Sequence, residues 1–535
     1  MSRSLIYITF AFLLLSCEKL YHPETISIGK IKDYDELVSA VNGVYARLNN
    51  AMGSYNAYDA NVKGDDLNTY MQVYDSYYVP LYNISCWQDR TGTFKTDFTW
   101  KNLYPVIISI NNILNQFIPL SDQNTKNREI LGEIYLIRAY CYFRLTRIYG
   151  RIPLISNIDI NYDLPRSSYT EIYIFIESDL KQAIALLPSD NKSARIPYET
   201  PHRGTAKAML AEVYLSWAGY PAKDVSKYNL AAKESGELID SASFFGMGLL
   251  KDFAWVWDGA HFHNSEAEFT LYFARPDKLP VIDAINQLYG ARLYDAYSYH
   301  NFKTSPGSPY YLIDFPPAEI NFFNNYPTGY RKDLTFFNNI YVPNGKNDEP
   351  QYPDIDTGYF HIDTVGLCDR IAYRKFYIQS YIVDDHTLYD YIPAGEVIIN
   401  FGIQRIYLFR YAQTLLTYAE ASARSGQLNA KAYECVNEIR RRARHLDLYT
   451  PSPFDLQPGL SSEVFADSVV WERAWELAGE PEGRWFDLVR LEKVEDLSKL
   501  RNSAEGGPPY PPITKDSYFF PIPQEDINLN PNLGK

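Results

Sequence analysis

Three glutamates near the C-terminus of this 535-residue sequence have a spacing that could support acid–base chemistry. Glu472, Glu476 and Glu480 are four residues apart, so they could share one face of a helix. Glycoside hydrolysis uses a pair of carboxylates in this way. Three arginines nearby can neutralise them: Arg473, Arg484 and Arg490. Because a neutralised carboxylate lacks the raised pKa of a general acid, we interpret the group as a structural salt-bridge network.

A second group of candidate ligands contains His261 and His263, close to Glu266 and Glu268. Alternate residues share a face of a strand, so the two histidines could approach one metal ion. The sequence offers no well-spaced third ligand, and this hypothesis is therefore weak. It also has no Gly-rich phosphate loop and no nucleophile elbow. We predict no catalytic residue, no metal and no cofactor.

Aromatic residues are unusually frequent, with 47 Tyr, 28 Phe and 8 Trp, and they gather in two polar segments. Sugars stack their C–H faces on aromatic rings while their hydroxyl groups bond to polar neighbours. Residues 70–90 supply the first set of candidate ligand contacts: Tyr74, Tyr77, Tyr78, Trp87, Gln88, Asp89 and Arg90. Residues 289–302 supply the second: Arg292, Tyr294, Tyr297, Tyr299 and Asn301. The alternative for each tyrosine is ordinary loop packing.

The N-terminus has the pattern of an export signal. Arg3 precedes the apolar run "LIYITFAFLLL", which is too short to span a bilayer. Cys17 stands at the edge of this run, and "LLSC" is similar to a bacterial lipobox. Residues 1–16 are therefore expected to be a signal peptide, with Cys17 lipidated and anchoring the chain to a membrane. The other four cysteines are scattered and predict no disulfide framework.

The formal net charge is −14, which excludes the common class of basic nucleic-acid binders. It also disfavours a polybasic membrane-surface protein.

Hydrophobic periodicity predicts several helices, at 100–118, 132–150, 171–188, 203–219, 228–240, 409–426 and 431–443. Pro105 is expected in the first turn, where proline is tolerated. In 132–150 one apolar stripe includes Cys141 as a core residue, while Arg144 and Arg147 lie off it. Arg138 lies near the edge of the stripe, so its charged end is expected either to extend to solvent or to meet a carboxylate.

Small residues among large ones predict closely packed helix pairs of the tetratricopeptide type. The segments between the helical blocks, 54–99 and 286–401, are rich in Tyr, Asn, Asp, Gly and Pro. Long irregular segments in a compact protein are usually functional, so we place the ligand-contacting surface there.

Several segments resemble the SusD/RagB family of outer-membrane lipoproteins. In chain order they are the lipobox at Cys17, "WKNLYPVIISINNIL" (100–114), "GEIYLIRAYCYFRLTRIYGRIPLI" (132–155), "YLFRYAQTLLTYAEA" (407–421), "ERAWELAGEPEGRWFDLVR" (472–490) and "YFFPIPQEDINLNPNL" (518–533). Two features depart from the family pattern. Glu480 and Arg484 are four residues apart where three is usual, and the chain ends in "NLGK".

The resemblance implies a mainly α fold, in which a tetratricopeptide-like helix-pair scaffold carries long irregular loops and small β elements. It also implies an order along the chain: signal peptide 1–16, tether and entry helix 17–45, N-terminal SusD-like helical part 46–260, and C-terminal part 261–535, which contains the loop-rich 286–401 and the helices of 409–443.

The implied function is not enzymatic. The chain would be a lipoprotein of the outer membrane, facing the cell exterior, that binds a nutrient and acts as a lid on a TonB-dependent transporter barrel. The Tyr and Trp content favours an oligosaccharide as cargo, with peptides as the alternative. Alternatives from other classes are a surface glycoside hydrolase and a structural or adhesive protein.

Overall fold

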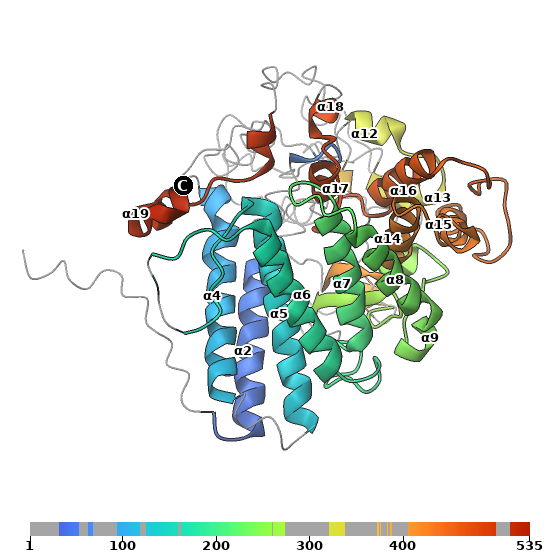
Figure 1. The fold of residues 1–535 in the computed structure, drawn as a ribbon. Coiled ribbons are helices and arrows are strands. Elements are labelled where there is room, and N and C mark those ends of the chain that lie inside the picture. The colour runs from blue at the N-terminus through green and yellow to red at the C-terminus, as the bar shows by residue number, and fades with distance from the viewer. Residues whose placement is uncertain are drawn as a thin grey trace, which may run out of the picture.

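The computed structural model describes residues 31–52, 63–67, 94–117, 125–158, 161, 163–258, 261–272, 320–337, 372–373, 375, 382–383, 386–387, 405–498 and 514–535. This part of the chain is mainly helical, which confirms the predicted fold class. Figure 1 shows the long helices standing side by side, with the helices of residues 411–476 on one flank and the C-terminal residues 524–529 on the other.

Among the described residues, six long helices form the N-terminal part of the scaffold: α2 (Tyr34–Met52), α4 (Phe94–Phe117), α5 (Thr125–Tyr149), α6 (Tyr169–Leu186), α7 (Arg203–Ala218) and α8 (Lys227–Asp240). Each packs mainly on its neighbours in chain order, α2 on α4, α4 on α5, and so on to α8. A capping box fixes the start of α6, where Ser168 accepts from the main-chain N–H of Glu171 and the Glu171 carboxylate accepts from that of Ser168. This sequential stacking confirms the predicted helix-pair scaffold.

The C-terminal part contains α14 (Tyr411–Arg424), α15 (Ala430–Arg442), α16 (Ser462–Glu476), α17 (Arg484–Arg490) and α18 (Val494–Ser498). Helix α14 packs on α7 and α8 as well as on α15 and α16, so it joins the two halves of the scaffold. At Gly219, just after α7, a Cβ atom would lie 2.5 Å from the main-chain oxygen of Arg490. Only glycine allows α7 and α17 to meet so closely.

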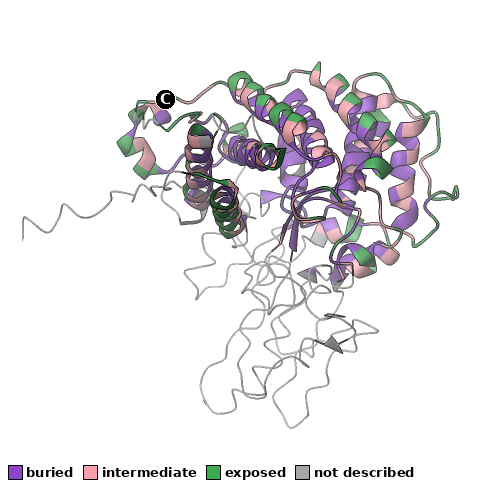
Figure 2. Cartoon of the chain, turned by 90° about the horizontal axis from the view of Figure 1, so that it is seen from below, coloured by how far each residue is buried: buried purple, intermediate pink, exposed green. Residues whose placement is uncertain are grey.

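The two longest strands among the described residues, β1 (Ala267–Tyr272) and β6 (Arg405–Arg410), form an antiparallel pair. Tyr272 lies opposite Arg405, and the register shifts between Ala267 and Thr270. Figure 2 shows these strands and the inner faces of the helices around them as buried. Because residues 409 and 410 pair with β1, helix α14 starts at Tyr411, and the expectation of a helix from residue 409 was wrong.

Short elements complete the described structure: α9 (Ala242–Phe245), η4 (Ala254–Val256), α12 (Ile320–Asn325), α13 (Tyr330–Thr335), β2 (Phe336–Phe337), β3 (Ala372–Tyr373), β4 (Ile382–Val383), β5 (His386–Thr387), η8 (Lys515–Tyr518), α19 (Gln524–Leu529) and η9 (Pro531–Gly534). β2 pairs with β3, and β4 with β5. None of the helices among the described residues is both long enough and apolar enough to cross a membrane.

One sequence expectation for the first helices needs correction. Pro105 lies inside α4, which begins at Phe94, and not in a first turn. Helix α5 is buried on every side along most of its length, so Arg144, which lies off the predicted apolar stripe, is also fully buried. Cys141 is a core residue as predicted, and Arg138 meets the carboxylate of Asp179 through two 2.7 Å hydrogen bonds.

Candidate functional site

The residues predicted to contact ligand and lipid lie outside the described residues. They are Tyr74, Tyr77, Tyr78, Trp87, Gln88, Asp89, Arg90, Arg292, Tyr294, Tyr297, Tyr299, Asn301 and Cys17. They therefore remain predictions. The structure does describe the framework positions from which these segments leave and to which they return.

Two of these positions lie next to each other. The Asn49 side-chain amide, in the last turn of α2, donates a 3.1 Å hydrogen bond to the main-chain oxygen of Tyr272 at the end of β1. Segment 53–93 starts just after α2, and segment 273–404 starts just after β1. Because Tyr272 pairs with Arg405, segment 273–404 also returns beside the point at which it leaves. The two predicted ligand segments thus depart from one junction of the framework.

A short described stretch, residues 63–67, fixes the first of these segments to the C-terminal part. The carboxylate of Asp65 accepts two hydrogen bonds from the Arg484 guanidinium, at 2.6 and 2.9 Å. The Asp66 carboxylate accepts from the main-chain N–H of Gly479 at 2.9 Å. The Lys63 ammonium donates to the main-chain oxygen of Ser517 at 2.6 Å. All three side chains from this stretch are buried, so they fix it to residues in the C-terminal part of the chain.

The second segment is fixed at the same place. The hydroxyl of Tyr373 in β3 donates to the main-chain oxygen of Asp66 at 2.7 Å. The Lys375 ammonium bonds to Glu480 at 2.8 Å and lies 4.6 Å from the centre of the Trp257 ring. Burial lowers the pKa of Lys375 to about 8, although Glu480 favours its charged form. We call residues 476–484 the anchor corner, because two loop-bearing segments are bonded to it.

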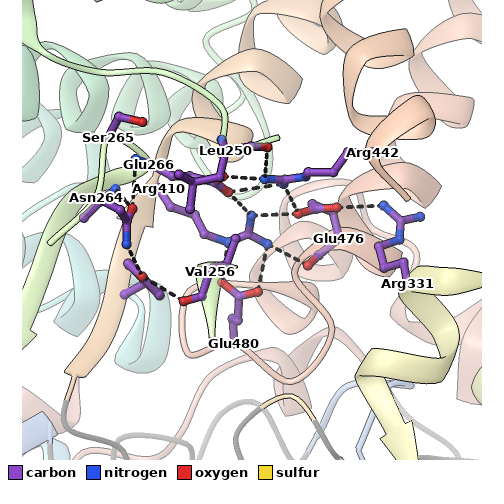
Figure 3. A network of polar contacts seen from close by, with 12 residues as sticks. Leu250, Val256, Asn264, Ser265, Glu266, Arg331, Arg410, Arg442, Glu476 and Glu480 are labelled. Atoms are coloured by element: carbon purple, nitrogen blue, oxygen red, sulfur yellow. Dashed lines mark hydrogen bonds and ion pairs between the residues drawn. The ribbon is translucent and has the colours of Figure 1, made fainter. Parts of the chain in front are cut away.

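The anchor corner is continuous with a buried network of charges (Figure 3). Glu476 bonds to Arg331, Arg410 and Arg442, each at 2.7 Å. Arg410 also bonds to Glu480 at 2.9 Å and to Glu266 at 2.7 Å. Burial alone would raise the pKa of Glu476, but the three guanidinium groups outweigh it and hold that pKa well below its usual range.

These contacts confirm the salt-bridge interpretation of Glu472, Glu476 and Glu480, but not the partners expected for them. Glu472 pairs with Arg331 and Arg440. The three expected arginines have other partners: Arg473 bonds to Glu212 and Asp487, Arg484 to Asp65, and Arg490 to Glu420 and Asp487. The sequence neighbours were the wrong choice because partners come from distant segments that fold onto α16.

The four residues of the weak metal hypothesis point to separate partners. His261 bonds to Asp258 at 2.9 Å, and His263 lies 3.3 Å from Glu199. Glu266 pairs with Arg410 and Arg442, and Glu268 accepts from the Thr414 hydroxyl at 2.7 Å. Within the described ranges no three His, Cys, Asp or Glu side chains are grouped to hold a metal ion.

Sequence reasoning missed Asp65, Asp66 and Lys375, which position the loop-bearing segments. Their local signal is weak, since two adjacent aspartates in "KGDDL" read as an ordinary polar loop. The partner of Arg484 could not be found from neighbouring residues, because Asp65 lies more than 400 residues away in the chain.

Solved structures share this architecture. A SusD homolog from Bacteroides thetaiotaomicron superposes with a TM-score of 0.72 at 22% identity, covering 94% of this chain and 97% of that chain. A laminarin-binding SusD-like protein superposes with a TM-score of 0.66 at 20% identity, covering 94% of this chain and 98% of that chain. The fold is therefore that of the SusD-like class of proteins.

Sequence comparisons identify the family. The family model described as "Starch-binding associating with outer membrane" matches residues 25–215, and the SusD family model matches residues 399–535. A curated relative, SusD-like protein P2 from Formosa agariphila, is 24% identical over 458 residues, which are 81% of this chain and 78% of the relative. This chain belongs to the SusD/RagB family.

Proposed function

We propose that this protein is a surface-exposed lipoprotein of the outer membrane that binds an oligosaccharide and delivers it, as a lid, to a TonB-dependent transporter. The observation that carries the proposal is the junction at Asn49 and Tyr272. At this junction the chain leaves the framework into segment 53–93 beside the point where it leaves into segment 273–404, and these two segments contain the two aromatic clusters. Two chain segments that leave from one place can contribute to one binding surface.

Three facts support carbohydrate as the cargo. The family model for the N-terminal part is described as starch-binding, and one solved relative with the same fold binds laminarin. The predicted contacts also combine aromatic rings with amide, carboxylate and guanidinium groups, which is the chemistry that sugars require. Peptide cargo is the alternative within the same role, and it would rely more on main-chain hydrogen bonds.

The position of the entry helix supports the lid role. The tether that starts at Cys17 joins the framework at Ile31, whose main-chain N–H donates to the Gln116 side chain at 3.0 Å. Helix α2 has 19 residues, so the segment junction at its other end is about 28 Å from this point at 1.5 Å per residue. A fixed end and a ligand-bearing end that are separated in this way suit hinge closure over a transporter.

A hydrolase role has less support. Of the carboxylates that suggested it, Glu476 and Glu480 have pKa values lowered by nearby guanidinium and ammonium groups, whereas a general acid needs a raised pKa.

The proposal is tested by affinity electrophoresis of the purified mature chain in gels that contain laminarin, xyloglucan, starch, xylan or mannan. A tryptic digest of casein, assayed by calorimetry, tests the peptide alternative. We expect retardation in at least one polysaccharide without release of reducing sugar. Binding to the digest and to none of the polysaccharides would move the cargo to peptides.

The transporter part of the proposal needs a separate experiment. The chain is purified from the membranes of its native host under mild detergent and its partners are identified by mass spectrometry. A co-purifying TonB-dependent barrel is expected, and its absence with a full yield of the lipoprotein would contradict the lid role.

A further inference from the structure

The turn that leads from α9 towards β1 exposes one tryptophan. Trp255 in η4 is 36% exposed, more than any other described tryptophan, whereas Trp257 two residues later is 2% exposed. Within the described part of the chain the Trp255 indole N–H makes no hydrogen bond. A large apolar ring with an open donor is therefore available at the surface.

A second flat ring stacks against one face of the exposed ring. The His261 imidazole stacks on Trp255 with ring centres 4.6 Å apart and an angle of 14° between the planes. The Asp258 carboxylate lies 2.9 Å from the Nδ1 atom of His261 and accepts from its main-chain N–H at 2.8 Å. Because Nδ1 faces this carboxylate, the Nε2 atom is the nitrogen left for another partner.

A buried arginine holds this turn in place. The Arg405 guanidinium donates to the main-chain oxygens of Val256 at 2.8 Å, Asp258 at 3.0 Å and His261 at 2.9 Å, and also to that of Phe262. The Tyr407 hydroxyl adds a 2.9 Å hydrogen bond to the Val256 oxygen. So many main-chain contacts from β6 fix the turn before any ligand arrives, which reduces the ordering cost of binding.

The turn also has a defined place in the molecule. Arg405 is the first residue of β6 and pairs with Tyr272, whose main-chain oxygen marks the segment junction. Phe262 packs on Tyr272 with ring centres 5.1 Å apart. The exposed rings are thus carried by framework residues beside the junction from which the predicted ligand segments leave.

We propose that Trp255, His261 and Asp258 form a further carbohydrate contact on the framework, in addition to the two predicted clusters. A pyranose ring stacks its C–H face on the face of Trp255 that His261 leaves open, and its hydroxyl groups bond to polar groups at the edge of the stacked pair: the indole N–H, Nε2 of His261 and the Asp258 carboxylate. This inference rests on the proposed function, because it assigns further residues to the same class of ligand.

The experiment compares variants of the full mature chain in calorimetry, with the gel-panel polysaccharide that the wild type binds most tightly as the probe. Trp255→Ala removes the platform, and Trp255→Phe keeps a ring without the indole N–H. Phe244→Ala is the matched control, since Phe244 on α9 is 60% exposed and lies outside the turn. Thermal unfolding verifies that each variant is folded, and His261→Ala tests the platform independently if Trp255→Ala is unstable.

We expect Trp255→Ala to weaken binding about three- to tenfold, with Trp255→Phe in between and Phe244→Ala unchanged. A folded Trp255→Ala variant with wild-type affinity would overturn the inference and leave the proposed function intact. The inference would also be overturned if Trp255→Ala bound the polysaccharide normally but no longer co-purified with the transporter, because the turn would then contact a protein and not a sugar. A wild type that binds none of the polysaccharides overturns the proposed function and this inference with it.

Discussion

The carboxylate of Asp65 and the guanidinium of Arg484 form a buried bidentate ion pair between residues 419 positions apart in the chain. Asp65 belongs to the stretch 63–67, which precedes the first aromatic segment, and Arg484 is the first residue of α17 and the last residue of the anchor corner. The pair therefore ties this stretch to the anchor corner.

Breaking this pair is expected to cost both stability and affinity. Asp65→Asn leaves the Arg484 guanidinium buried and uncompensated, a change that typically costs about 3–5 kcal/mol of the free energy of unfolding. Denaturant unfolding measures this loss, and calorimetry with the preferred polysaccharide measures affinity. The control is Asp467→Asn, whose side chain is 47% exposed and pairs with Lys493 and more distantly with Arg424, and it should change little. Equal stability of the two variants would show that the pair does not anchor the segment.

We expect Glu476 to be required for folding and to have no catalytic role. Glu476→Gln removes the negative charge shared by Arg331, Arg410 and Arg442, so we expect a loss of about 3–5 kcal/mol or failure to fold. Glu234→Gln, which weakens a partly exposed pair with Lys207, should cost less than about 1 kcal/mol. Soluble yield and urea unfolding give the comparison. A stable Glu476→Gln chain that has lost a measurable hydrolysis would contradict this account.

The stability of the protein should depend on pH through Glu268. Burial, together with Glu266 and Glu212, raises the pKa of this carboxyl from 4.5 to about 8, against the hydrogen bond from Thr414 and the charge of Arg410. Between these values the folded chain keeps a proton that the unfolded chain releases. The contribution of Glu268 to stability is therefore full below pH about 4.5 and is lost as the pH rises towards 8.

Glu268→Gln mimics the protonated form at every pH. Its melting temperature should match that of the wild type near pH 4.5 and exceed it by a growing margin up to pH 8. Glu266→Gln serves as the contrast, because it removes a partner of Arg410 and Arg442 and should destabilise at every pH. A constant difference between Glu268→Gln and the wild type across this range would show that Glu268 is ionised in the folded protein.

The junction between α2 and β1 should matter for ligand binding as well as for stability. Asn49→Ala removes the hydrogen bond to the Tyr272 oxygen, at an expected cost of about 1 kcal/mol. If the junction positions both aromatic segments, affinity for the preferred polysaccharide falls too. Asn102→Ala removes a comparable side-chain hydrogen bond within α4 and should leave affinity unchanged. Identical affinities of the two variants for the polysaccharide would show that the junction does not position the binding surface.

Local patterns predicted the helices well, because their signals lie within a few residues. The apolar stripe through Cys141 and the carboxylate beside Arg138 are examples of features that periodicity can reveal. Strand β6 was missed because its short sequence, "RIYLFR", is compatible with a helix until its pairing with β1 is known. Short apolar runs do not carry enough information to distinguish the two.

The anchor contacts could not be predicted from the sequence for a different reason. Asp65 and Arg484, or Lys375 and Glu480, meet only when segments far apart in the chain come together, and a single sequence contains no signal for such pairs. The family resemblance supplied the fold and the basis for the proposed role. It did not supply ligand contacts, since residues such as Trp87 lie in segments that no motif defines.

The central claim is that this framework presents aromatic loops that capture an oligosaccharide. It is tested most directly by calorimetry of the wild type and of Trp87→Ala with the polysaccharide that the gel panel selects. The account predicts saturable binding by the wild type and at least about a tenfold weaker affinity for the folded variant, as loss of a central aromatic contact gives. Wild-type affinity in Trp87→Ala would contradict the predicted site, and a wild type that binds no member of the panel would contradict the claim itself.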